Sequence, residues 1–162
     1  MALTKRERRN LENALEQIAL SEKAAAALRY SYQRAPEIKE DKDFDEADWE
    51  RWDALAVRFA RLSDILTQRV FRAIDVVEFM PPRSTFIDRI NRAEKRGHIS
   101  SAFEWKEIRE IRNQIVYEYA NEHVLPLLQD MVQYAPELLN CVDRLADYKQ
   151  EIVKKIEGSP GE

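Results

Sequence analysis

The chain of 162 residues has few of the residues that interrupt or cross-link a protein. Only three glycines and six prolines are present, so long uninterrupted helices are expected. Cys141 is the single cysteine, which excludes an internal disulfide framework and a cysteine-rich zinc site. We therefore expect a reduced protein whose fold needs neither a metal nor a cofactor.

Long apolar runs are missing as well. No stretch approaches the roughly 20 apolar residues that span a bilayer, and the segment from Met1 to Leu15 lacks the apolar core of a signal peptide. The sequence therefore predicts a cytoplasmic protein without membrane contact. A net charge of −4 argues against a surface that binds nucleic acid everywhere, although it leaves room for a local basic site.

The features that are present indicate helices. Hydrophobic residues make up 44% of the chain and recur at helical spacing, whereas strand-like alternation is not found. The pattern predicts an all-α, up-and-down bundle of about five helices, with one domain over residues 1–157 and a disordered tail over 158–162. The expected helices are 4–34, a long one from about Trp49 to the Met80-Pro81-Pro82 break, one that begins after a Ser84 or Thr85 cap and ends at Gly97, one from Ser101 to near Ala120 or Asn121, and one that begins after Pro136.

One helical segment, "REIRNQIVYEYANE" (Arg109 to Glu122), carries an arginine beside its apolar stripe. On a wheel of about 100° per residue with Ile108 at zero, Arg112 lies about 40° away and Tyr119 about 20° away. Tyr117 falls on the opposite side. An arginine on the apolar side needs a partner, and three remain open: a carboxylate of the bundle, a dimer interface or a bound phosphate.

The wider segment "DRINRAEKRGHISSAFEWKEIREIRNQIVYEYANE" resembles the HEPN superfamily of small helical toxins and nucleic-acid-processing domains. The likeness is greatest to HEPN proteins encoded beside minimal nucleotidyltransferases. In that group a helix that ends in a basic residue and glycine precedes a tryptophan-bearing helix, which reads R-x-x-R-N, three residues, then H-x-Y. Arg109, Arg112, Asn113 and Tyr119 occupy the matching positions here.

This resemblance implies the toxin component of a toxin–antitoxin pair, with a nucleotidyltransferase-type antitoxin as its partner. The family activity is metal-independent RNA cleavage, performed where two copies of the motif meet in a homodimer. The resemblance assigns charge stabilisation on the phosphate to Arg112, with Asn113 beside it and Arg109 in support. Tyr119 corresponds to a site that the partner enzyme modifies with adenylate groups, and a bulky anion there blocks the RNA path.

The chain departs from the family pattern at Tyr117, which occupies the position of the catalytic histidine. Tyrosine, with an ordinary pKa of about 10, is a poor base at neutral pH. Since general acid–base catalysis contributes roughly 10²- to 10⁴-fold, cleavage is expected to be weak or absent. Tyr117 is open to three interpretations: natural drift in a copy that binds without cutting, an engineered substitution that silences a toxic nuclease, or weak residual activity through Arg112 and Asn113. His98 and His123 are the remaining histidines that can approach the site in space.

Two other classes of function stay open at this point. One is a non-catalytic HEPN module that binds or scaffolds a nucleotidyltransferase. The other is a structural bundle unrelated to RNA, in which Arg112 simply joins two helices through a salt bridge.

Overall fold

The structure is a computed structural model that describes residues 2–41, 43–81, 83–117 and 123–160. These residues form five helical rods and no strand, which confirms the predicted all-α bundle. The rods are α1 (Lys5–Arg34), the continuous run of α2 (Glu46–Asp64), the π-helical η2 (Ile65–Val70) and α3 (Phe71–Val77), then α4 (Phe86–Lys95), α5 (Ala102–Tyr117) and α6 (Val124–Glu157). A short 3₁₀ turn, η1 (Ala35–Glu37), follows α1.

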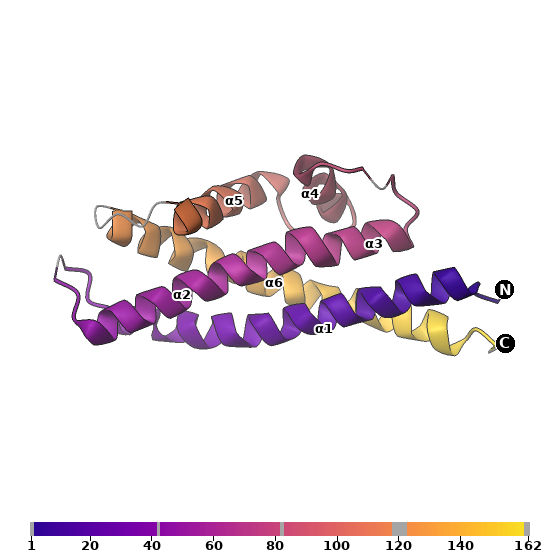
Figure 1. Cartoon of the computed structure of the whole chain (residues 1–162), viewed down its shortest axis with the longest axis horizontal. Coiled ribbons are helices and arrows are strands. Elements are labelled where there is room, and N and C mark those ends of the chain that lie inside the picture. Colours follow the sequence, from indigo (N-terminus) through magenta and orange to yellow (C-terminus); the bar gives the residue numbers. More distant parts are fainter. Residues whose placement is uncertain (1, 42, 82, 118–122, 161–162) are drawn as a thin grey trace.

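Four of the rods alternate in direction along the long axis of the molecule, as Figure 1 shows. These four are α1, the α2–α3 rod, α5 and α6. The N- and C-termini lie at the same end of the molecule. The short α4 lies beside α3 and α5. Among the described residues, none of the helices combines the length and the apolar character needed to cross a membrane.

Side-chain caps determine where three of the helices begin. At the start of α1, the Glu7 N–H donates to Thr4 Oγ1 at 3.1 Å, and the Thr4 N–H donates to Glu7 Oε2 at 2.8 Å. Asp45 and Thr85 cap α2 and α4 in the same reciprocal way. Such boxes satisfy amide groups that have no partner within the first turn, so local sequence alone defines these starts.

The core lies between α1, the α2–α3 rod and α6. Leu28, Phe59 and Leu138 have no exposed surface, and each comes from a different one of these rods. Trp52 is buried as predicted, and its indole N–H donates to the Val124 carbonyl at 3.1 Å. Trp49 is half-buried and packs edge-on against Trp52. Trp52 therefore belongs to the core, while Trp49 keeps part of its surface exposed.

The long second rod does not keep a uniform helical pitch. Its turns widen to π-helical hydrogen bonding over Ile65–Val70, a feature that the regular apolar spacing did not predict. Within this segment the Thr67 hydroxyl donates to the Ser63 carbonyl at 2.8 Å, while the Thr67 carbonyl accepts a hydrogen bond from Arg89 Nε at 3.0 Å. Single π turns are uncommon and often occur at functional sites.

The prediction that the last helix starts after Pro136 is wrong. Helix α6 begins at Val124 and continues through Pro136 to Glu157. A proline inside a helix costs about 3 kcal/mol, because it lacks the N–H donor and clashes with the preceding turn. Met131 and Leu138, both fully buried on either side, each contribute about 1.5–3 kcal/mol by burial and offset that cost.

The ends of the other elements agree with the sequence only in part, since α2 begins at Glu46, three residues before the expected start near Trp49. Gly97, with φ of 81°, ends α4 in the left-handed conformation that glycine accepts most readily. Helix α5 is described to Tyr117, and its predicted end near Ala120 or Asn121 lies outside the described residues. In the predicted tail, Ser159 is buried, and its hydroxyl accepts a hydrogen bond from the Leu3 N–H at 2.9 Å.

The Thr85 cap is the first testable feature, because α4 carries two residues of the site described below. Replacing Thr85 with alanine removes the acceptor for the Asp88 N–H and should lower the free energy of unfolding by about 1 kcal/mol. Urea unfolding measures the change. Thr85→Ser keeps the hydroxyl and is expected to stay close to wild type; equal losses in both variants would show that the cap is not responsible.

Candidate functional site

Arg112 joins α5 to the C-terminal end of α2 through a two-pronged ion pair with Asp64. The Arg112 Nε donates to Asp64 Oδ1 at 2.8 Å, and Nη2 donates to Asp64 Oδ2 at 2.9 Å. A third donor, Nη1, reaches the side-chain oxygen of Asn113 at 3.4 Å. This parallel pairing is the strongest geometry available to an arginine and a carboxylate, and it determines the direction in which the guanidinium points.

The ion pair identifies which of the three predicted kinds of partner Arg112 has in this chain. The partner is a carboxylate of the bundle, and the hydrogen bond to Asp64 is the main reason that the pKa of Arg112 is raised. The Arg112 side chain is 23% exposed, so it lies at the edge of the apolar stripe rather than within it. The guanidinium is thus charged, oriented and accessible from one side.

A pocket of about 120 Å³ opens beside this pair. Helix α2, η2, α4 and α5 all contribute to its wall, so residues that are distant in sequence meet here. The lining residues are Ser63, Asp64, Thr67, Gln68, Phe86, Arg89, Arg109, Arg112 and Asn113.

Positive charge dominates the pocket wall, which has three arginines and one carboxylate, that of Asp64. Arg89 is 6% exposed and is anchored by neutral groups: Nε donates to the Thr67 carbonyl at 3.0 Å and Nη1 to the Ser84 carbonyl at 2.8 Å. Burial, followed by repulsion from Arg72, lowers the pKa of Arg89. Two cations therefore remain after Asp64 has neutralised one.

Arg109, the residue predicted to support the site, contributes the third guanidinium. Its central carbon lies 4.4 Å from the centre of the Phe86 ring, a cation–π distance that holds the long side chain over α4. Among the described residues, neither Arg109 nor Arg89 forms an ion pair with a carboxylate. The structure thus brings Arg109, Arg112 and Asn113 together in one pocket, as the motif spacing suggested.

Tyr117 lies one and a half turns beyond Arg112 on α5 and is 78% exposed. After Asp64, an interaction with Tyr117 is a smaller cause of the raised pKa of Arg112. A side chain at position 117 can therefore act beside Arg112. Tyr119, the candidate modification site, lies outside the described residues.

The two histidines do not take the place of the one missing from the motif. His98 precedes α5 and packs edge-on against Tyr148 of α6, with ring centres 5.1 Å apart. Burial lowers its pKa to about 4, so it is neutral at physiological pH and lacks the imidazolium proton that a general acid would supply. His123 occupies the N-cap position of α6, where its side chain forms no capping hydrogen bond. Neither histidine is among the described residues that line the Arg112 pocket.

Sequence reasoning missed two important members of the site. Asp64 gives no local signal, because its role depends on Arg112, which is 48 positions away. Arg89 could have been found: it follows Phe86 by three positions and precedes Ala93 by four, which places it on the buried face of α4. A charged residue on an apolar face is the same anomaly that drew attention to Arg112.

Comparison of the chain with known protein families, with curated proteins and with solved structures yields no match. Within the described residues, no group of three or more histidine, cysteine, aspartate or glutamate side chains is arranged to hold a metal ion. The pocket wall offers guanidinium, amide, hydroxyl and carboxylate groups.

A double-mutant cycle tests the ion pair. Arg112→Ala and Asp64→Ala should each destabilise the fold, and the double variant should lose less than the sum, with a coupling of about 1 kcal/mol. Solvent screening limits this value, since both side chains are partly exposed. Urea unfolding at low and high salt provides the measurement, and the coupling should shrink as salt rises. Strict additivity would contradict the pairing.

His98 predicts a pH dependence of stability. Its pKa of about 4 in the folded protein lies below the ordinary 6.5, so the unfolded chain binds the proton more readily. The contribution of His98 is therefore complete above pH 6.5 and is lost as pH falls towards 4, by an amount on the order of 3 kcal/mol. Urea unfolding of His98→Gln across this range should show a flatter profile than wild type. The matched variant His123→Gln, which alters an exposed histidine, should keep the wild-type slope.

Proposed function

We propose that this chain is a HEPN-type, RNA-directed protein whose Arg112 pocket binds a phosphodiester group. In this proposal it is the toxin component of a toxin–antitoxin pair, and its metal-independent endoribonuclease activity is weakened by Tyr117. The observation that carries the proposal is the excess of arginine in the pocket. Arg89, Arg109 and Arg112 meet one carboxylate, in a protein whose overall charge is negative.

The size and chemistry of the pocket favour a small anion. A volume of about 120 Å³ is below the roughly 300–1,000 Å³ of sites for drug-sized ligands, so the pocket suits a single phosphate group. Guanidinium groups stay charged and match phosphate oxygens with their paired donors. Arg89 and Arg112 are also held in place before any ligand arrives, which reduces the entropy lost on binding.

In this proposal, the identity of the side chain at position 117 determines how fast RNA is cleaved. In RNA cleavage the 2′-oxygen forms a bond to phosphorus while the bond from phosphorus to the 5′-oxygen breaks; a base removes the 2′-proton, and an acid supplies one to the leaving oxygen. A histidine performs both transfers near neutral pH, because its ordinary pKa lies near 6.5. Tyr117 interacts electrostatically with Arg112 but tyrosine is a poor base, so Arg112 and Asn113 stabilise charge without efficient proton transfer.

A homodimer completes the proposal. Val116 and Tyr117 are 49% and 78% exposed at the C-terminal end of α5, next to Arg112 on the same helix. An apolar surface that adjoins a charged pocket is suited to bury against a second copy, which would bring two Arg112 pockets together. In the same proposal, the nucleotidyltransferase partner neutralises the protein by adding adenylate groups at Tyr119.

A second function has its own supporting observation. No histidine is found among the described residues that line the pocket, and Asp64 already occupies the best donors of Arg112. The missing histidine suits a non-catalytic HEPN partner, in which Arg89 and Arg109, rather than Arg112, bind phosphate groups while a nucleotidyltransferase performs the chemistry. In that case the pocket binds without cutting.

The decisive experiment restores the histidine. Tyr117→His should produce metal-independent cleavage of RNA, measured in the presence of a chelator, at a rate at least about 10²-fold above wild type. Adding Arg112→Ala to this variant should abolish the gain. Tyr117→Phe is the matched control, because it changes the same side chain without supplying a base.

The outcomes separate the two functions. Cleavage by the histidine variant supports the nuclease proposal. If Tyr117→His cuts no class of RNA, yet Arg112→Ala still weakens binding of RNA or of a nucleotidyltransferase, the non-catalytic function is correct. If neither variant changes cleavage or binding and Arg112→Ala lowers only the melting temperature, Arg112 is a structural link between helices.

A further inference from the structure

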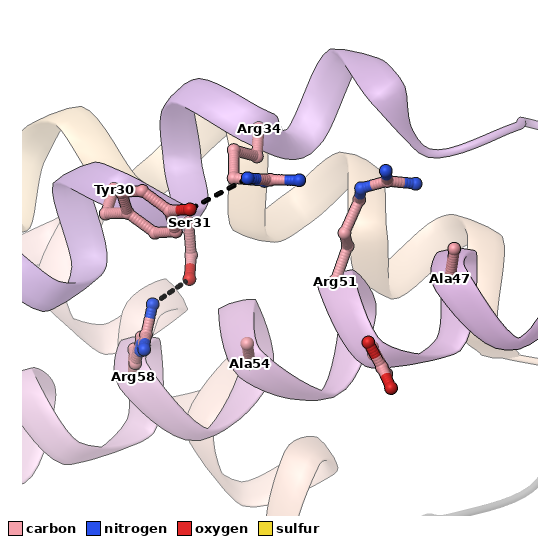
Figure 2. Close-up of a pocket in the computed structure, with 8 residues that line it drawn as sticks. Tyr30, Ser31, Arg34, Ala47, Arg51, Ala54 and Arg58 are labelled. Atoms are coloured by element: carbon pink, nitrogen blue, oxygen red, sulfur yellow. Dashed lines mark hydrogen bonds between the residues drawn. The ribbon is translucent and has the colours of Figure 1, made fainter.

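A second pocket, separate from Arg112, lies between the C-terminal end of α1 and the first half of α2 (Figure 2). Its volume is about 300 Å³, and it shares no lining residue with the Arg112 pocket. Small side chains create the space: Ala47 and Ala54 are two turns apart on α2 and leave the groove unfilled. Longer side chains from both helices frame it.

Arginine dominates this second pocket also. Arg34, Arg51 and Arg58 line it, with Glu50 as the one acidic residue in the wall. Arg34 and Arg51 share a carboxylate outside the wall, that of Glu37, at 3.3 and 3.5 Å. Arg51 is also paired with the buried Asp48 carboxylate at 3.9 Å, so Arg34, which only shares Glu37, is the one of the two that retains capacity for a further anion.

Arg58 is the strongest candidate for contact with a ligand. Its Nη1 donates to Ser31 Oγ at 2.7 Å and to the Ala27 carbonyl at 3.3 Å, and these neutral acceptors hold the side chain against α1. Among the described residues it forms no ion pair. A partly buried guanidinium that is oriented but not neutralised attracts an anion, and desolvation strengthens that attraction.

Tyr30 adds an aromatic surface at the rim. The residue is 56% exposed, and its hydroxyl accepts a hydrogen bond from Arg34 Nη1 at 2.8 Å. The guanidinium carbons of Arg34 and Arg58 lie 5.4 and 5.9 Å from the ring centre. Figure 2 shows Tyr30, Arg34 and Arg58 around one opening. The tyrosine is thus held by cations while part of its surface stays open to solvent.

We propose that this pocket binds a nucleoside phosphate unit, with the phosphate at Arg34 and Arg58 and the base against Tyr30. An aromatic ring beside guanidinium groups is the combination that recognises nucleotides without reading their sequence, because every base has a face that can stack. The unit comes either from a free nucleotide or from a single RNA strand. This inference goes beyond the function proposed for Arg112 and does not depend on cleavage there.

Calorimetric titration tests the proposal with three probes: inorganic phosphate, AMP and a short oligoadenylate. Wild type should bind AMP more tightly than inorganic phosphate. Arg58→Gln should weaken AMP binding by about tenfold or more, the loss expected for one charged hydrogen bond. Tyr30→Ala should weaken AMP binding while leaving phosphate binding nearly unchanged.

Ala47→Glu offers a variant that blocks the pocket without endangering the fold. It places a negative charge in the groove, yet an acidic residue in the first turn of α2 interacts favourably with the helix dipole. AMP binding should fall by at least about tenfold, as with Arg58→Gln, while the melting temperature stays close to wild type. Gln150→Glu, an exposed position on α6 with the same change of charge, is the matched control and should bind AMP normally.

The arms of the experiment also identify the source of the nucleotide. An oligoadenylate that binds at least tenfold more tightly than AMP, and loses that gain in Ala47→Glu, indicates an RNA strand. Equal affinities indicate a free nucleotide. In an Arg112→Ala background, which weakens the first pocket, Arg58→Gln should still reduce AMP binding by about tenfold, and this separates the result from the first pocket. The proposal is overturned if Arg58→Gln and Ala47→Glu bind AMP as wild type does, or if phosphate binds as tightly as AMP and Tyr30→Ala has no effect.

Discussion

The ion pair between Arg112 and Asp64 holds α5 against the second rod at the point where the α-helical turns give way to the π segment. One carboxylate accepts two donors of the guanidinium, so the arginine is held at the edge of the core with its remaining donor towards Asn113. The neighbouring Thr67 carbonyl in turn accepts a hydrogen bond from Arg89. Arg112 and Arg89 therefore link three rods, and the pocket lies between the side chains of these rods.

Charge is distributed unevenly over this protein. The chain as a whole carries a net charge of −4, yet two separate pockets each contain three arginines and one acidic residue in their walls. Holding cations close together costs electrostatic free energy, and in both pockets neutral acceptors rather than carboxylates secure one of them: the Thr67 and Ser84 carbonyls for Arg89, and Ser31 with Ala27 for Arg58. Arrangements of this kind retain positive charge that carboxylate pairing would remove, which is the property an anion site requires.

Features that depend on neighbouring residues could be predicted from the sequence. The start of α1 at Thr4, the start of α4 at Thr85 and the end of α4 at Gly97 follow from caps that act within a few positions. The prediction that the last helix starts after Pro136 was wrong, because it considered only the residues next to the proline. Its local cost is real, but the burial of Met131 and Leu138 against other rods outweighs it, and that gain cannot be read from the proline's own neighbours.

The candidate site also combines features that follow from neighbouring residues with features that depend on packing between distant ones. The sequence by itself determined that the chain is helical and that Arg109, Arg112 and Asn113 share one helix, because helical periodicity is a property of consecutive residues. It also showed that Arg112 needs a partner. Only the tertiary structure decided that the partner is Asp64, that Arg89 enters the same pocket, and that the Arg58 guanidinium lies beside the Tyr30 ring. These pairings join residues tens of positions apart, and packing between rods brings them together, so no local pattern can specify them.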